Sequence, residues 1–167
     1  MKKLIALFVA IVLVSGFATV NAQVTATATG SATIITPIAI SKTTDMNFGS
    51  VAVSATAGTV ILTSASTRSI TGGVTLPAVT GTVAAAVFAV SGLGSSTYSI
   101  LLPASYIISS GGNSMTVNNF TSTPSSTGTL SGGAQNVQVG ATLNVAASQP
   151  AGTYINAAGF NVTVNYN

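Results

Sequence analysis

The sequence predicts an all-β protein, an antiparallel sandwich of short strands, and three observations carry this expectation. From residue 23 onward the chain is rich in Val, Ile, Thr and Ala, of which the β-branched types favour strands. Breaks of Gly, Ser and Asn recur about every ten residues, as they do between the strands of a sandwich. No stretch carries a capped apolar stripe at helical spacing.

Alternating apolar and polar residues set the expected strands in order. They fall at residues 24–35, 38–41, 46–53, 59–64, 68–70, 82–90, 97–102, 106–109, 114–120, 137–145 and 159–166. Segment 82–90 has some helical periodicity, but its β-branched residues and flanking glycines favour a buried strand. Strands 106–109 and 114–120 should form a hairpin through Gly111 and Gly112, since glycine supplies positive φ, and 121–133 has loop composition.

The first 22 residues have the pattern of a secretory signal peptide. Lys2 and Lys3 precede an apolar run at 4–14 that is too short to span a bilayer, and small or short residues precede a cleavage point after Ala22. The mature chain then begins at Gln23, and 23–167 is one domain in length. We expect export through the periplasm to the cell surface or the medium, with membrane contact only during export.

The chain lacks the side chains that most catalytic and metal sites require. It has no His, Cys, Trp or Glu, and Asp45 is its single side-chain carboxylate. Paired-carboxylate catalysis, a Ser-His-Asp triad and a zinc site are therefore excluded. A Ser-Lys pair would use Lys42, but Ala39 stands where that motif needs serine. We expect no enzyme, no cofactor and no metal.

The mature chain also has few charged side chains. After residue 22 the charged side chains are Lys42, Asp45 and Arg68, a net charge of +1. Two cations cannot make the several phosphate contacts of a nucleic-acid interface. A nearly neutral surface instead favours self-association, so we expect the partners to be other copies of the chain or related subunits.

The two ends of the mature chain carry the clearest period-two patterns. At the C-terminus, one face holds Phe160, Val162, Val164 and Tyr166, a candidate assembly strand that a partner could pair with at its edge. At the N-terminus, one face of the first strand holds Val24, Ala26, Ala28, Gly30, Ala32 and Ile34. This second strip either enters a groove on another subunit, as a donor strand, or completes the sandwich of its own chain.

The tyrosines allow two interpretations. Their rings could line a sugar site, but we favour Tyr98 and Tyr154 as core or corner residues whose hydroxyls are hydrogen-bonded.

Six segments together resemble a known family. They read TDMNFGSVAV, GGVTLP, FAVSGLGSSTYSILLP, MTVNNFTS, VGATLNV and PAGTYINAAGFNVTVNYN, and in this order they resemble the exported bacterial family called domain of unknown function 4402. The ending is also similar to spore coat protein U-like and archaic chaperone–usher pilin subunits, through Pro150, Gly152 and Tyr154 followed by the alternating C-terminal strand. Unlike many of those pilins, this chain has no cysteine for a disulfide.

The resemblance to pilins implies an immunoglobulin-like sandwich of the pilin and adhesin type, which lacks one strand. It implies a periplasmic chaperone and an usher as partners, and donation of residues 24–34 to the next subunit. About a dozen residues at about 3.3 Å each reach roughly 40 Å, enough to fill a groove. We therefore expect a secreted structural protein, a fimbrial or surface-fibre subunit. The alternatives are a monomeric carbohydrate-binding adhesin and a self-complemented coat protein without a ligand.

Overall fold

The computed structural model describes residues 22–167, so the predicted signal peptide lies outside the described residues except for Ala22. Ile35–Asn167 form one compact unit, and residues 22–34 belong to a separate one. The regular secondary structure of the described residues is entirely β. In the same residues no helix is long and apolar enough to cross a membrane.

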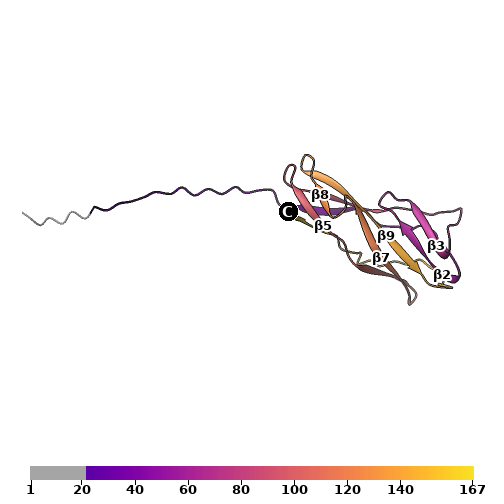
Figure 1. Ribbon diagram of the computed structural model, residues 1–167. Helices are drawn as coiled ribbons and strands as arrows, with labels where there is room; N and C mark the ends of the chain where they lie inside the picture. Colours follow the sequence, from indigo (N-terminus) through magenta and orange to yellow (C-terminus); the bar gives the residue numbers. More distant parts are fainter. Residues whose placement is uncertain (1–21) are drawn as a thin grey trace, which may run out of the picture. The chain divides into compact units, whose positions relative to one another are not determined.

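Ten strands build the compact unit (Figure 1). Their bounds are β1 Ala39–Thr44, β2 Ala52–Leu62, β3 Arg68–Thr75, β4 Ala86–Ser91, β5 Thr97–Leu101, β6 Ser105–Ser110, β7 Asn113–Thr123, β8 Thr127–Thr129, β9 Ala134–Val145 and β10 Thr163–Tyr166. Seven of them form one antiparallel sheet, and β10, β5 and β8 form a second one in that order. The two sheets pack as a sandwich, as the alternating sequence predicts.

Strand β9 organises the larger sheet. Along one edge it pairs first with β4, through residues 134–139, and then with β2, through residues 141–145. Along its other edge it pairs with β7, which continues the sheet to β6. Two arms therefore leave the same edge of β9, one ending at β1 and the other at β3.

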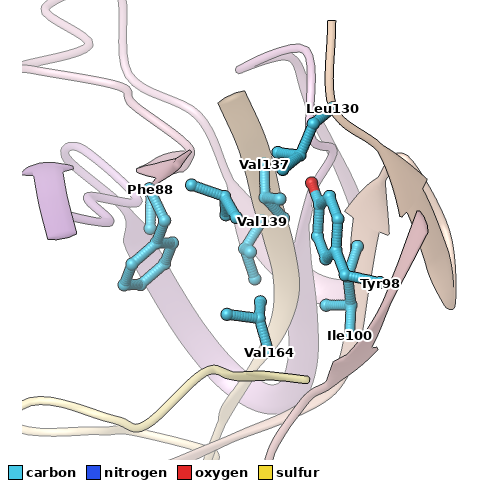
Figure 2. Packing of buried hydrophobic residues seen from close by; sticks show 9 residues of the cluster. Phe88, Tyr98, Ile100, Leu130, Val137, Val139 and Val164 are labelled. Atoms are coloured by element: carbon cyan, nitrogen blue, oxygen red, sulfur yellow. The ribbon is translucent and has the colours of Figure 1, made fainter. Parts of the chain in front are cut away.

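The first arm and the three-stranded sheet enclose one core, which we call the first cluster (Figure 2). The larger sheet supplies Ala86, Phe88, Val90, Val137 and Val139, and the smaller sheet supplies Tyr98, Ile100 and Val164. Tyr98 is completely buried, and its hydroxyl donates a hydrogen bond to the side chain of Gln135, 2.6 Å away. This confirms Tyr98 as a core residue.

A second core, the second cluster, lies under the other arm. Its buried members are Phe48, Val60, Leu62, Val74, Val117, Ala141, Leu143 and Val145. All of them except Phe48 belong to β2, β3, β7 and β9 of the larger sheet. Within the described residues, the three-stranded sheet contributes nothing to this cluster.

The prediction of a strand at residues 24–35 is wrong. Residues 22–38 form no strand, and every side chain in 22–34 is exposed, Val24 at 91% and Ile34 at 97%. The alternating pattern is present, but a strand is stable only when a neighbour satisfies its backbone N–H and C=O groups. The period-two pattern therefore shows that this segment could pair as a strand, although it forms no strand within residues 22–167.

Two other predicted strands are shorter than expected. Residues 46–51 carry a single bridge, from Asn47 to Ala84, and β2 begins only at Ala52, because Gly49 turns the chain with a φ of 69°. The C-terminal strand spans Thr163–Tyr166 and not 159–166. Its partner β5 ends at Leu101, just before Pro103, which has no N–H to continue the pairing.

The predicted hairpin is confirmed, with β6 and β7 joined through Gly111 and Gly112, both at positive φ. Residues 121–133 are not the continuous loop that their composition indicated, because β7 extends to Thr123 and β8 pairs with β5. Backbone pairing with a neighbour outweighs the weak local preference of Ser, Thr and Gly here.

Candidate functional site

An open groove of about 1060 Å³, lined by both apolar and polar residues, lies over the second cluster. Strands of the larger sheet line it with mostly apolar side chains, Phe88, Ile108, Met115, Val117, Leu143 and Val145. The rest of its lining comes mainly from two stretches without regular structure, residues 45–51 and 149–160. At this end of the sandwich, segments without regular structure therefore cover the second cluster. At the other end, the three-stranded sheet covers the first cluster.

The first of these stretches is fixed by hydrogen bonds within a turn. Asn47 accepts a hydrogen bond from the Gly49 N–H at 2.8 Å through its side-chain oxygen. The Arg68 guanidinium donates to the carbonyls of Phe48 and Ser50. A methyl group at Gly49 would meet both the Thr80 carbonyl and this guanidinium, so glycine is required there. Arg68 is therefore a structural clamp on one side of the groove.

The second stretch is fastened to the hairpin. Ser109 and Ile155 exchange two backbone hydrogen bonds of 3.1 Å. The Tyr106 hydroxyl donates to the Asn156 carbonyl, and the Asn156 side chain donates to the Ile107 carbonyl. These contacts satisfy one edge of the stretch, the edge that faces β6.

Further along the same stretch, Tyr154 forms a corner. Its hydroxyl donates to the Pro150 carbonyl at 2.7 Å and accepts a hydrogen bond from the Gln149 side chain at 2.9 Å. This confirms the prediction that Tyr154 is a hydrogen-bonded corner residue. Tyr106 and Tyr166 also donate their hydroxyl protons within the chain, so all four tyrosines do so. The arrangement leaves the aromatic hydroxyls already satisfied by the protein.

Phe160 joins the two cores. Its ring lies 5.0 Å from that of Phe120, 5.6 Å from that of Tyr106 and 6.1 Å from that of Phe88, measured between centroids. It lines the groove and also packs against the first cluster. Val162, Val164 and Tyr166 pack against the first cluster as well, so the predicted apolar face of the C-terminal strand does point inward.

Strands β1 and β10 each have an edge without a strand partner among the described residues. Strand β1 pairs with β4, and Asn47 continues that pairing to Ala84; in the described residues no strand pairs with the opposite edge of β1. Strand β10 pairs with β5 alone among those same strands. Lys42 of β1 and Phe160, just before β10, both line the groove. The unpaired edge of β1 therefore reaches the groove at Lys42.

Two of the three charged side chains in residues 22–167 line this site. Lys42 and Asp45 form an exposed ion pair and both line the groove. Burial raises the pKa of the Tyr106 hydroxyl, and the Asp45 carboxylate raises it further. No group of three or more His, Cys, Asp or Glu residues that could hold a metal occurs within residues 22–167. The groove therefore combines apolar side chains with one exposed ion pair.

The sequence predicts one part of the groove lining and does not predict the rest. The period-two pattern at the C-terminus predicts Phe160 on an apolar face. Ile108 and Met115 were placed in the hairpin without a role, although they face each other across it, as do Tyr106 and Val117. Apolar pairs at these positions were the available signal for an inward face. The six residues of the N-terminal strip, from Val24 to Ile34, are exposed.

Comparison with known proteins adds one finding. The model of a family described as domain of unknown function, DUF4402, matches residues 38–166. The match begins just before β1 and ends at Tyr166, so it covers both sheets and the groove. Searches of curated proteins and of solved structures found no match.

Proposed function

The chain belongs to the DUF4402 family, and we propose that it is a secreted structural protein, a fimbrial or surface-fibre subunit that assembles by β-strand addition. The open groove carries the proposal. It leaves buried side chains such as Val117 and Leu143 without a covering strand, and the unpaired edge of β1 reaches it at Lys42. A partner strand would supply both missing parts at once.

In the proposed mechanism an extended segment lies in the groove beside β1 and the chain leading into β10. Main-chain hydrogen bonds give the affinity, and alternate side chains enter the groove and fix the register. A shift by one residue would turn the apolar face of the incoming strand to solvent, which makes the register strict. The immunoglobulin-like topology, in which this strand completes the sandwich, is part of the same proposal.

The proposed donor is the exposed strip of residues 24–34 of another copy. Val24 and Ile34 are large and stand at its ends, and burying each contributes about 1.5–3 kcal/mol. The four positions between them are Ala and Gly, which allow a close approach to the sheet. Main-chain pairing would therefore contribute more than side-chain burial in the middle of the strand.

The groove also supports export with helpers. An apolar groove on a subunit in transit is an aggregation hazard, so a periplasmic chaperone that covers it and an usher that releases it are the expected partners. The alternative of a self-complemented coat protein uses the same groove and strip within one chain. The carbohydrate-binding alternative is less favoured, because the tyrosine hydroxyls are already hydrogen-bonded within the protein.

The test uses the exported chain and a variant that lacks residues 23–35. We expect the intact chain to form fibres or a ladder of oligomers by electron microscopy and sizing, and the deletion variant to stay monomeric. A synthetic peptide of residues 23–35 should bind that variant and raise its melting temperature, whereas a scrambled peptide of the same composition should not. An intact chain that stays monomeric, together with a deletion that merely unfolds, would show that strand donation between subunits is wrong.

A further inference from the structure

Strand β1 has an unpaired edge with which a second copy of the chain could pair. Among residues 22–167 it pairs with β4 alone. Its six residues span about 20 Å, which is an ordinary strand length. Edges of this kind are templates for pairing between copies, and natural proteins block them with charges, prolines or bulges. The side chains of β1 therefore decide whether this edge is open.

Lys42 places a positive charge on the inward face of this edge strand. It lies directly opposite Phe88 of β4, and Ile40, two residues earlier, lies opposite Val90. Residues that lie opposite each other in an antiparallel pair share one face of the sheet. Because Phe88 and Val90 are buried in the first cluster, Lys42 is on the same face as that core. An inward-pointing charge is one of the features that block edge pairing.

Two further features add to this block. The pairing of β1 with β4 shifts its register between Lys42 and Thr44, and such an irregularity increases the local twist of the edge. Asp45 forms an ion pair with Lys42 and holds the ammonium group at this point of the edge. The Lys42 side chain is still 54% exposed, so a strand laid along the edge would remove water from it.

Pairing between the β1 edges of two copies is therefore costly. A two-fold axis would join the two sheets with their inward faces on the same side. Two registers then pair most of the strand. One places Lys42 opposite Ile40 of the second copy, which desolvates the ammonium group, and the other places the two Lys42 side chains opposite each other, which opposes like charges. Either arrangement destabilises the pair.

A strand with small side chains meets a lower cost at the same position. The four-carbon stem of lysine reaches past a small neighbour and keeps the ammonium group in water. The four central face positions of the proposed donor strip are Ala and Gly. Lys42 therefore penalises a large apolar side chain opposite it and tolerates Ala or Gly there.

We propose that Lys42 is a specificity-determining residue of the groove, which keeps the free edge of β1 from pairing with β1 of a second copy and reserves it for a strand with small side chains. The inference rests on the proposed function, since it presumes that a donor strand enters beside β1. It adds the reason why subunits join through a donor strand and not edge to edge.

The test uses the full mature chain with Ala28→Pro and Ala32→Pro, which we call the donor-blocked chain, because proline cannot donate a hydrogen bond to a neighbouring strand. Lys42→Ile and Lys42→Thr remove the charge from this chain, and Lys42→Arg keeps it. Ser41→Ile is the matched control, since it adds the same apolar side chain to the same edge at a residue that lies opposite Ala89, on the other face. Sedimentation equilibrium gives the dimer dissociation constant of each variant.

We expect the donor-blocked chain to stay monomeric, and so should Lys42→Arg and Ser41→Ile. Lys42→Ile should lower the dimer dissociation constant by roughly 100-fold, since two ammonium groups no longer lose water on pairing. Lys42→Thr should lower it by roughly ten-fold, and it provides the test if Lys42→Ile is insoluble. Hydrogen exchange should show newly protected amides in β1 of these dimers.

Calorimetric titration with peptides tests the preference for small side chains. A 23–35 peptide that carries Ala28→Leu and Gly30→Leu should bind Lys42→Thr at least roughly ten-fold more tightly than it binds the donor-blocked chain. The natural 23–35 peptide should bind both chains equally well.

The results that would overturn the inference differ in what else they overturn. If Lys42→Ile and Lys42→Thr stay monomeric, if Ser41→Ile dimerises as strongly as they do, or if the leucine peptide binds both chains equally, Lys42 does not determine what pairs with β1. The proposed function survives these results as long as the natural peptide binds. If the natural peptide binds no chain, the proposed function fails and the inference fails with it.

Discussion

Both ends of the sandwich bury similar side chains, but a sheet covers them at one end and irregular chain covers them at the other. In the first cluster both sheets contribute, and Tyr98, Val137 and Val139 are sealed from solvent. In the second cluster Val60 and Val117 are just as buried, but the strand residues come from one sheet and irregular chain takes the place of the other. The difference separates the part of the molecule that holds the fold from the part that is available to a partner.

The first prediction tests the sealed end, where we expect the largest effect. Tyr98→Ala removes a fully buried ring and its hydrogen bond to Gln135, and should lower the free energy of unfolding by about 3–5 kcal/mol. Tyr98→Phe is the control, which removes only the hydrogen bond and should lower it by about 1 kcal/mol. Urea denaturation measures both. A loss below about 1 kcal/mol for the alanine variant would contradict a sealed core.

The second prediction compares the two ends with the same substitution. Val137 and Val117 are 0% and 1% exposed, in the first and second cluster respectively. Val137→Ala should lower the free energy of unfolding by about 2 kcal/mol, because the cavity it leaves cannot collapse. Val117→Ala should lower it by roughly half as much, since water and the neighbouring groove side chains can relax into the space. Equal losses would show that the groove end is packed as tightly as the sealed end.

The third prediction concerns pH. Burial raises the pKa of Tyr98 and of Tyr106, and Asp45 adds to the increase at Tyr106. A raised tyrosine pKa means that the folded state favours the neutral hydroxyl. The resulting stability is complete below the unfolded-state pKa of about 10 and is lost as the pH rises through the folded-state value. We therefore expect the melting temperature to fall above about pH 10, and less steeply in Tyr98→Phe; an unchanged slope in that variant would contradict this.

The smallest effect is expected at the mouth of the groove. The side chains of Lys42 and Asp45 are 54% and 80% exposed, so their ion pair is screened by solvent. Lys42→Ala should change the free energy of unfolding of the free subunit by less than about 1 kcal/mol. Chemical denaturation at low and high salt checks this, and a larger loss that disappears in salt would show that the pair stabilises the fold itself.

Much of the larger sheet could be predicted from the sequence, because β9 and the hairpin carry strong local signals. The alternation in 137–145 and the glycines at 111 and 112 determine these elements locally. The period-two pattern predicts the apolar face of the C-terminal strand equally well. This face, formed by Phe160, Val162, Val164 and Tyr166, does pack inward.

The groove could not be predicted, because it depends on the absence of pairing at particular edges. The pattern at 46–53 is a good strand pattern, yet the turn at Gly49 and the clamp by Arg68 keep most of it irregular. The pattern at 24–34 is better still, yet these residues form no strand. Local propensity indicates whether a segment can form a strand. Whether it does so depends on the tertiary structure, which determines whether a neighbouring strand edge is available for pairing.

Hydrogen exchange on assembled and donor-deleted protein tests the central claim most directly. If a strand enters the groove, two sets of backbone amides should become protected together on assembly. The first set makes no hydrogen bond within the described residues and comprises the amides of Met46, Phe48, Val51, Phe160, Asn161 and Val162. The second set is the amides of the donor at 24–34. Amides of β5 and β9 serve as the internal reference, since they are paired in both states. Assembly that leaves the groove amides exchanging as fast as in the donor-deleted chain would contradict strand addition at this site.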